Sequence, residues 1–277
     1  NSGHIYSSTI KLTPTFEIFP DEPEPAAPEP SKPESPVSIP PAVQEPVPKP
    51  HQTHRPRIAI VIDDLGYDFQ LAQKFIQLDR SISLAILPHT PFQKKISSIA
   101  QKEGMETLLH LPMEPMEYPR ISPGEGALLT HMSLGELSAV LVEDLDFVPG
   151  VRGVNNHMGS RFTTLPAPLK TVFLELKERN LFFLDSRTTP DTRAESVAKE
   201  VGLPFARRNI FLDHIASAEF TREQLAKLLS IAQRDGTAIG IGHPIDSTYA
   251  ELAKALPALK HQAAIVPVSQ LIRPGPE

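Results

Sequence analysis

Acidic and histidine side chains follow seven apolar runs of this sequence, and these residue types carry proton transfer and metal binding. Exposure to solvent does not explain this placement, because polar side chains could be solvated equally well anywhere in the loops. Histidine is also a rare residue. Carboxylates and imidazoles gathered at one place can act as general acid, general base or metal ligand. The side chains concerned are Asp63, Asp64, His89, His110, His157, Asp185, Asp213 and His243.

The pair Asp63-Asp64 ends the first run, RIAIVIDD. Neighbouring side chains of a strand point to opposite faces, but where the chain turns at the strand end both carboxylates can reach one rim. We expect one to bind a metal while the other takes a proton. The alternative is helix capping, with Asp64 or Asp68 at the start of a helix over 69–80.

His110 and His157, with a carboxylate, make a His₂-Asp set with an open position, a pattern typical of catalytic zinc. Glu114 is four residues beyond His110 and is either a further ligand or a side chain that orients His110. A satisfied core histidine is the alternative for each imidazole.

Further polar side chains accompany these candidates. His243 follows a small apolar strand in GIGHP, where Gly242 allows close approach of another group. Asp185 and Arg187 form either an ion pair that positions a catalytic group or a salt bridge at the rim. Around His157 we expect substrate-binding or supporting side chains at Asn156, Ser160 and Arg161.

Alternating apolar runs and helical patterns position these residues. The runs are too apolar for a sheet with one solvated face, so the pattern predicts a parallel sheet covered by helices, open or closed into a barrel. Active sites of such folds lie at the carboxyl ends of strands. The expected strands are 57–64, 83–88, 106–112, 151–157, 181–186, one within 205–213, 238–243 and 264–269. The expected helices are 69–80, one from Thr90-Pro91 to Gly104, one from a Ser133/Glu136 capping box to Val148, 166–179, 191–201, one capped by Thr221 and Gln224 and ending at Gly236, and one capped by Ser247.

Proline marks a boundary. Of 30 prolines in 277 residues, 14 lie between Pro14 and Pro56. Proline lacks the backbone donor that helix and sheet need, so residues 1–56 are predicted to be a disordered, acidic, Pro-rich linker before a folded domain over 57–277. A docking ligand for a proline-binding module is the alternative.

The bulk composition excludes several classes. The net charge of −6, shared equally between residues 1–56 and the remainder, argues against nucleic acid as a partner. Cysteine is absent, which excludes disulfides and thiolate metal sites. No apolar run reaches 18 residues, so we expect no transmembrane segment, and no GxGxxG or GxxxxGK[ST] motif supports nucleotide binding. Because the chain begins at Asn1, we expect that a signal or membrane anchor was removed.

Five segments, IDDLG, LLHLPMEP, NNHMGSRFT, FLDSRT and GHP, occur in an order that resembles the divergent polysaccharide deacetylase family, a branch of the NodB-like carbohydrate esterases. The resemblance covers about residues 57–272. It implies a NodB-like distorted (β/α) barrel and metal-dependent removal of an acetyl group from an N-acetylated sugar polymer. By this resemblance Asp63 matches the base aspartate, Asp64 the metal aspartate, His110 the first metal histidine and His243 the general acid.

The sequence also departs from classical members. They carry two histidines four residues apart on one loop, whereas Glu114 holds the second position here. NNHMGSRF replaces their Arg-x-Pro-Pro motif, so we place the second metal histidine at His157, with zinc as the expected metal.

The sequence therefore predicts a metal-dependent deacetylase-like hydrolase that acts on an N-acetylated polysaccharide or peptidoglycan-type glycan of the bacterial envelope. The alternatives are a catalytically degenerate carbohydrate-binding envelope module that recruits a partner, and a metal-dependent phosphoesterase or amidase. We expect a periplasmic or extracytoplasmic location, tethering through the removed segment, and an envelope protein partner for the Pro-rich segment.

Overall fold

The computed structural model describes residues 55–273. The predicted linker over 1–56 therefore lies outside the described residues, except for Arg55 and Pro56. Parallel strands form one sheet in the order β6-β5-β4-β3-β2-β1-β8-β7, with β9 paired to β1. The strands are β1 (Arg57–Leu65), β2 (Ser83–Ile86), β3 (Thr107–Met113), β4 (Gly153–Met158), β5 (Phe182–Asp185), β6 (Phe205–Arg207), β7 (Ile210–Phe211), β8 (Thr237–Gly242) and β9 (Ala264–Ile265).

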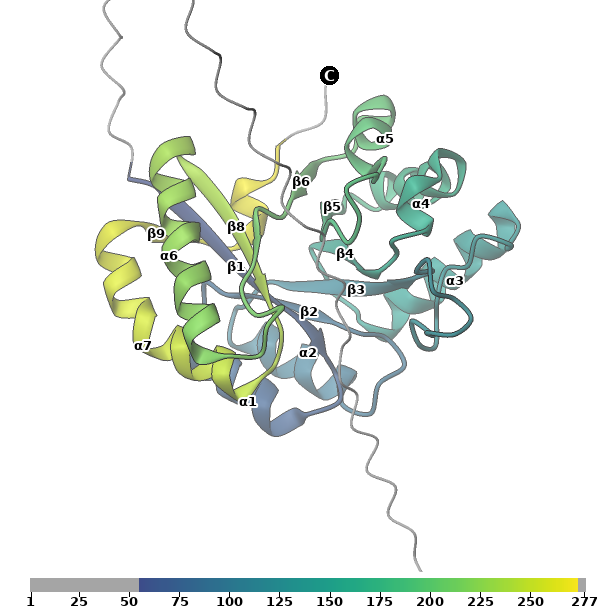
Figure 1. Cartoon of the computed structure of the whole chain (residues 1–277). Helices are drawn as coiled ribbons and strands as arrows, with labels where there is room; N and C mark the ends of the chain where they lie inside the picture. The colour runs from purple at the N-terminus through teal and green to yellow at the C-terminus, as the bar shows by residue number, and fades with distance from the viewer. Residues whose placement is uncertain (1–54, 274–277) are drawn as a thin grey trace, which may run out of the picture. The chain divides into compact units, whose positions relative to one another are not determined.

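The sheet is curled (Figure 1). Strands β6 and β7 lie at opposite ends of the strand order, yet only Arg208 and Asn209 separate them in the sequence. The two edges must therefore approach each other at this seam, which makes the sheet a half-barrel. This arrangement confirms the predicted distorted (β/α) barrel and explains why 205–213 forms two short strands instead of one.

Helices cover the outside of the curled sheet (Figure 1). Ser133 and Glu136 form the predicted capping box of α3, and Asp68 caps α1 by accepting from the Leu71 N–H at 2.9 Å. Among residues 55–273 no helix has the length and apolarity to span a bilayer. The helices are α1 (Phe69–Leu78), α2 (Gln93–Lys102), α3 (Leu134–Phe147), α4 (Pro166–Glu178), α5 (Ala194–Val201), α6 (Ala218–Asp235) and α7 (Asp246–Gln262), with 3₁₀ turns at Phe162–Thr164 and Val268–Leu271.

Both faces of the sheet are buried, as its uniformly apolar strands require. In β1, Ile58, Ile60 and Ile62 join the large core between sheet and helices. The alternate residues Ala59 and Val61 join a smaller cluster on the inner face. Because alternate side chains of a strand point to opposite faces, an apolar run is what a strand covered on both sides needs.

Three local expectations are wrong. Ser217 caps α6, accepting from the Phe220 N–H at 3.2 Å, so Thr221 and Gln224 lie buried inside the helix. Ser247 lies within α7, which has no side-chain cap. The predicted strand 264–269 pairs only over Ala264–Ile265 and then continues into a 3₁₀ turn, since Pro267 lacks a backbone donor.

Candidate metal and acid–base site

The carboxyl ends of β1, β3 and β4 bring the predicted ligands together. The backbone turns sharply at Asp64, whose φ of 55° is left-handed, and the pairing of β1 with β2 shifts between Ile62 and Leu65. This local turn replaces the normal alternation, so Asp63 and Asp64 both reach His110. In the neighbouring pair of strands, His157 of β4 lies beside Pro112 of β3.

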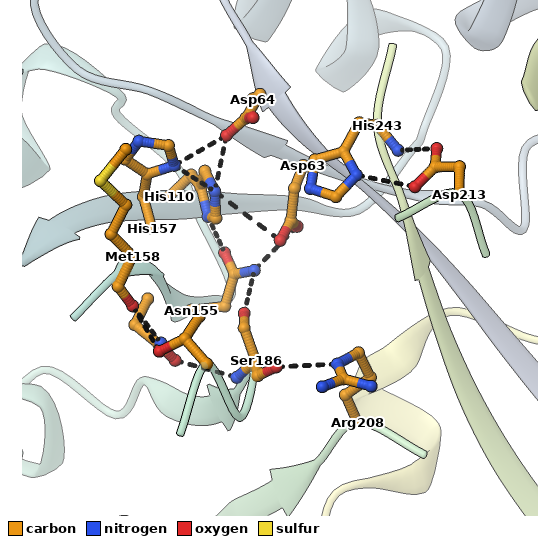
Figure 2. A network of polar contacts seen from close by, with 12 residues as sticks. Asp63, Asp64, His110, Asn155, His157, Met158, Ser186, Arg208, Asp213 and His243 are labelled. Carbon is orange, nitrogen blue, oxygen red and sulfur yellow. Dashed lines mark hydrogen bonds and ion pairs between the residues drawn. The ribbon is translucent and has the colours of Figure 1, made fainter. Parts of the chain in front are cut away.

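Asp64, His110 and His157 form a compact group (Figure 2). The Asp64 Oδ1 atom lies 2.8 Å from His157 Nδ1 and 3.0 Å from His110 Nε2, and the two ring nitrogens are 3.2 Å apart. Ligand atoms around tetrahedral zinc are separated by roughly 3.3 Å. The group therefore needs to open by only a few tenths of an ångström to hold a divalent cation.

Two further observations test this fit. Asn155 presents Nδ2 to Asp63 and Ser186, so its carbonyl oxygen accepts from His110 Nδ1, 2.9 Å away. In the neutral ring the lone pair of His110 then lies on Nε2, the atom that faces Asp64. The Asp64 Oδ1 atom is buried, and within residues 55–273 its polar neighbours are the ring nitrogens of His110 and His157. Buried acceptors that face one another are what a bound cation satisfies, so the residues fit a metal.

The electrostatics agree with a cation-binding group. Burial alone would raise the pKa of the Asp64 carboxyl, but His157 and His110 hold it well below its ordinary value. Asp64 is therefore an anion, the form that binds metal. Burial alone would lower the pKa of His110, but the carboxylates of Asp63 and Asp64 outweigh it and raise that pKa.

Asp63 lies beside the metal-binding group but outside it. Asp63 is 2% exposed, and its side chain accepts a hydrogen bond of 2.8 Å from Asn155, while Oδ2 is 3.6 Å from His110 Nε2. Burial raises the pKa of the Asp63 carboxyl above its ordinary value. A more basic carboxylate that coordinates nothing is suited to accept a proton.

His243 forms a second acid–base unit with Asp213 (Figure 2). The ring donates from Nδ1 to Asp213 Oδ1 at 2.7 Å, and Asp213 Oδ2 accepts from the His243 backbone and from Thr248. Burial alone would lower the pKa of His243, but Asp213 outweighs it and raises the pKa to about 9. At neutral pH the ring therefore keeps a proton on Nε2. The close approach expected at Gly242 is made by Asp213 and Thr248, whose atoms a side chain there would meet at 3.2–3.3 Å.

Glu114, predicted as either a further ligand or a side chain that orients His110, lies outside the metal-binding group of Asp64, His110 and His157. Its buried carboxylate accepts from the Thr130 N–H at 2.5 Å and pairs with Arg161 at 3.0 Å. Ser160 accepts from the Met116 N–H at 2.9 Å. Glu114, Arg161 and Ser160 therefore connect the loops that follow β3 and β4, and within residues 55–273 Glu114 forms no hydrogen bond or ion pair with His110.

The side chains of Asp185 and Arg187 form no ion pair within residues 55–273, although the charge of Arg187 partly offsets the rise that burial causes in the Asp185 pKa. Asp185 accepts from the backbone N–H of Arg187 at 2.8 Å and from Thr192 at 3.0 Å, which shapes the turn after β5. Asn156 accepts from the Ser186 N–H at 2.9 Å and so ties this turn to β4. The side chains of Asp185 and Asn156 therefore support the site without belonging to the metal-binding group.

Sequence reasoning did not single out Asn155, Ser186 or Arg208, and it gave Asp213 no partner. Asn155 precedes His157 by two residues, so the period of a strand places both on one face, and this signal could have found it. Arg208 donates to the Ser186 carbonyl at 2.7 Å, but it is distant in sequence from its partners. No local pattern marks it.

The fold and site define a class: a NodB-like α/β half-barrel with a His₂-Asp group at the carboxyl ends of its strands. Residues 60–272 match the family described as divergent polysaccharide deacetylase. The chain belongs to this family.

Individual relatives support the assignment. The chain is 32% identical to the uncharacterized protein YibQ of Escherichia coli over 216 residues, which cover 78% of this chain and 67% of that protein. The crystal structure of the uncharacterized protein ATU2773 from Agrobacterium tumefaciens has a TM-score of 0.76 at 28% identity, covering 79% of this chain and 90% of that one. BA3943 from Bacillus anthracis, described as a CE4 family pseudoenzyme, shares the fold with a TM-score of 0.51 at 9% identity, covering 79% of this chain and 66% of that one.

Proposed function

We propose that this protein is a metal-dependent deacetylase that removes acetyl groups from an N-acetylated glycan. The observation that carries the proposal is the position of Asp63, a buried carboxylate outside the metal-binding group that is 3.6 Å from one of its ligands. His243, protonated near neutral pH, supplies the second acid–base group. Hydrolysis of an amide needs both a base for the attacking water and an acid for the leaving amine.

Asp64, His110 and His157 would hold the metal, with zinc favoured by two imidazoles and one carboxylate. A divalent cation bound there supplies Lewis-acid chemistry, which polarises an acyl carbonyl and makes water more acidic. Asn155 fixes the His110 ring so that Nε2 faces the group.

The remaining steps belong to the side chains of the chain. Asp63 accepts a proton from the water whose oxygen forms the new bond to the acetyl carbon. The bond between that carbon and the glycan nitrogen then breaks, and His243 donates its Nε2 proton to the leaving amine. Asp213 stabilises the protonated imidazole before this transfer and orients the ring through Nδ1.

An envelope location agrees with a glycan substrate. In our proposal the Pro-rich residues 1–56 separate the domain from a membrane anchor or bind an envelope protein, while the domain acts on peptidoglycan-type glycan in the periplasm. Proline-rich segments act as extended spacers of about 3 Å per residue, which suits reach toward a cell wall.

Acetate release from N-acetylated oligosaccharides tests the function. The Asp63→Asn and His243→Ala variants should lose at least about 100-fold in acetate release while still binding one equivalent of metal. The exposed His261→Ala change serves as the matched control, because His261 lies in the last turn of α7.

The rival function, a carbohydrate-binding module without catalysis, predicts another result. The metal-loaded protein would then bind the oligosaccharides but release no acetate, and Asp63→Asn would leave binding unchanged. Release of phosphate or cleavage of another amide, without acetate release, would favour the phosphoesterase or amidase alternative.

A further inference from the structure

Two arginines beside the site lack an acidic partner. The ion pairs formed within residues 55–273 include Arg207 with Glu195 at 2.9 Å, but none involves Arg187 or Arg208. Arg187 is exposed at the turn after β5, and Arg208 is partly buried at the seam between β6 and β7. A guanidinium stays charged at neutral pH, so this side of the site carries two positive charges that form no ion pair within residues 55–273.

Arg208 is held rigidly by neutral groups. Its Nε donates to the Ser186 carbonyl at 2.7 Å and its Nη2 donates to the Arg187 carbonyl at 3.0 Å. The guanidinium also stacks over the ring of Phe211, 3.6 Å from its centroid. These contacts fix the plane of the fork, and among the described residues they leave Nη1 free to donate to a ligand.

The location connects Arg208 to the reacting groups. Ser186, whose carbonyl holds Arg208, also accepts from Asn155 at 3.2 Å, and Asn155 holds Asp63 (Figure 2). The Phe211 ring under Arg208 lies 5.7 Å from the ring of His243. Arg208 is therefore linked to both acid–base groups, to Asp63 through Ser186 and Asn155 and to His243 through Phe211.

The neighbouring carboxylates form their hydrogen bonds with other groups than the guanidinium groups of Arg187 and Arg208. Asp185 uses its oxygens for the Arg187 backbone and Thr192, and Asp213 uses its own for His243 and Thr248. Burial, followed by repulsion from Arg187, lowers the pKa of Arg208 to about 10, and the attraction of Asp185 and Asp63 offsets this only in part. An added anion would relieve this repulsion.

We propose that Arg208 and Arg187 form a subsite for a carboxylate on the sugar part of the substrate, so that the preferred glycan is acidic. This inference rests on the proposed function, because the deacetylation site defines which part of the substrate lies next to Arg208. A carboxylate can accept a charge-assisted hydrogen bond from the free Nη1 of the fixed Arg208 guanidinium, and hydrogen bonds of this kind are strong.

The test compares one ligand in two charge states. An N-acetylated glycan strand with lactyl carboxylates, and the same strand after amidation of those carboxylates with methylamine, are titrated calorimetrically into the metal-loaded full chain. The wild type should bind the carboxylate form at least about tenfold more tightly, and this preference should weaken as salt screens the charges.

Matched variants assign the effect. Arg208→Gln should bind both strands equally, and Arg187→Gln should lose part of the preference. Arg207→Gln, which removes the adjacent arginine and its pair with Glu195, should behave as the wild type. Thermal melting checks that each variant folds. If Arg208→Gln proves unstable, the test relies on Arg187→Gln, which changes only an exposed side chain.

Two results overturn the subsite. Equal binding of the two strands by the wild type would do so, and so would a preference that persists in folded Arg208→Gln, because the carboxylate would then bind elsewhere, including on the metal. Acetate release measured in parallel separates the two proposals. Charge-dependent binding without acetate release refutes only the deacetylase, whereas acetate release with equal binding refutes only the subsite.

Discussion

Asn155 donates a hydrogen bond of 2.8 Å to Asp63, from a side chain that no solvent reaches. The same amide accepts from His110 at 2.9 Å. One neutral side chain therefore positions both the candidate base and a candidate metal ligand. Burial raises the pKa of the Asp63 carboxyl, and it outweighs the lowering by His110, His243 and the hydrogen bond from this amide.

Replacing this amide should damage both functions together. Asn155→Ala is expected to weaken metal binding 10–100-fold, as is typical when a side chain that orients a ligand is lost, and to reduce acetate release by at least as much. Metal titration and turnover at saturating metal separate the two effects, since misplacement of Asp63 lowers turnover even when metal is bound.

Asn209→Ala is the matched control for Asn155. Asn209 accepts from the Ile239 N–H at 2.8 Å, so its loss also removes an asparagine hydrogen bond within the sheet. It should reduce stability without weakening metal binding. If Asn155→Ala behaves like Asn209→Ala, Asn155 has only a structural role.

Glu114 provides a test of the ligand set. Because Glu114 pairs with Arg161 and Thr130, Glu114→Gln should keep full metal stoichiometry and cost about 1 kcal/mol of stability, the usual size of one hydrogen bond. Asp64→Asn should lose stoichiometric metal. Metal analysis after gel filtration measures both, and loss of metal from Glu114→Gln would restore Glu114 as a ligand.

The strand ends were predictable because each apolar run stops at a polar residue, and a parallel sheet brings such ends to one rim. The metal-binding group follows from that rule together with residue type. The geometry at Asp64 was less accessible, since a left-handed backbone at a non-glycine residue depends on the surrounding packing.

The partners of His243 and Arg208 could not be predicted, for a topological reason. The segment 205–213 reads as one strand, but Arg208 and Asn209 take the chain across the seam from β6 to β7. Only this crossing puts Asp213 beside His243 and Arg208 beside the Ser186 carbonyl. The spacing of residues in the sequence does not show which edges of the sheet meet.

Metal binding should stabilise the domain. With free metal at 100 times its dissociation constant, binding adds about 2.7 kcal/mol, or roughly 5–10 °C in melting temperature for a domain of this size. Adding a chelator should remove this increment in the wild type, whereas His157→Ala should show none. His261→Ala should respond as the wild type. A melting temperature that does not change with metal in any of the three proteins would argue against the site.

The pair of His243 and Asp213 predicts a pH dependence. Asp213 raises the pKa of His243 from 6.5 to about 9, so the protonated acid is present up to that pH and activity should fall above it. In Asp213→Asn the pH above which activity falls should move down toward 6.5. The pH profile of kcat/KM for acetate release measures the shift.

Stability should follow the same titration. A histidine whose pKa is higher in the folded state stabilises the protein fully below its unfolded value of 6.5 and loses that contribution as the pH rises through about 9. Asp213→Asn should therefore lower the free energy of unfolding by on the order of 3 kcal/mol at pH 6. At pH 10 His243 is neutral, so only the smaller loss from the changed hydrogen bonds of Asp213 should remain. Urea unfolding at pH 6, 8 and 10 measures it, with Asp235→Asn, an exposed aspartate paired with Arg234, as control. A deficit that is equal at pH 6 and pH 10 would show that His243 does not carry the proton assigned to it.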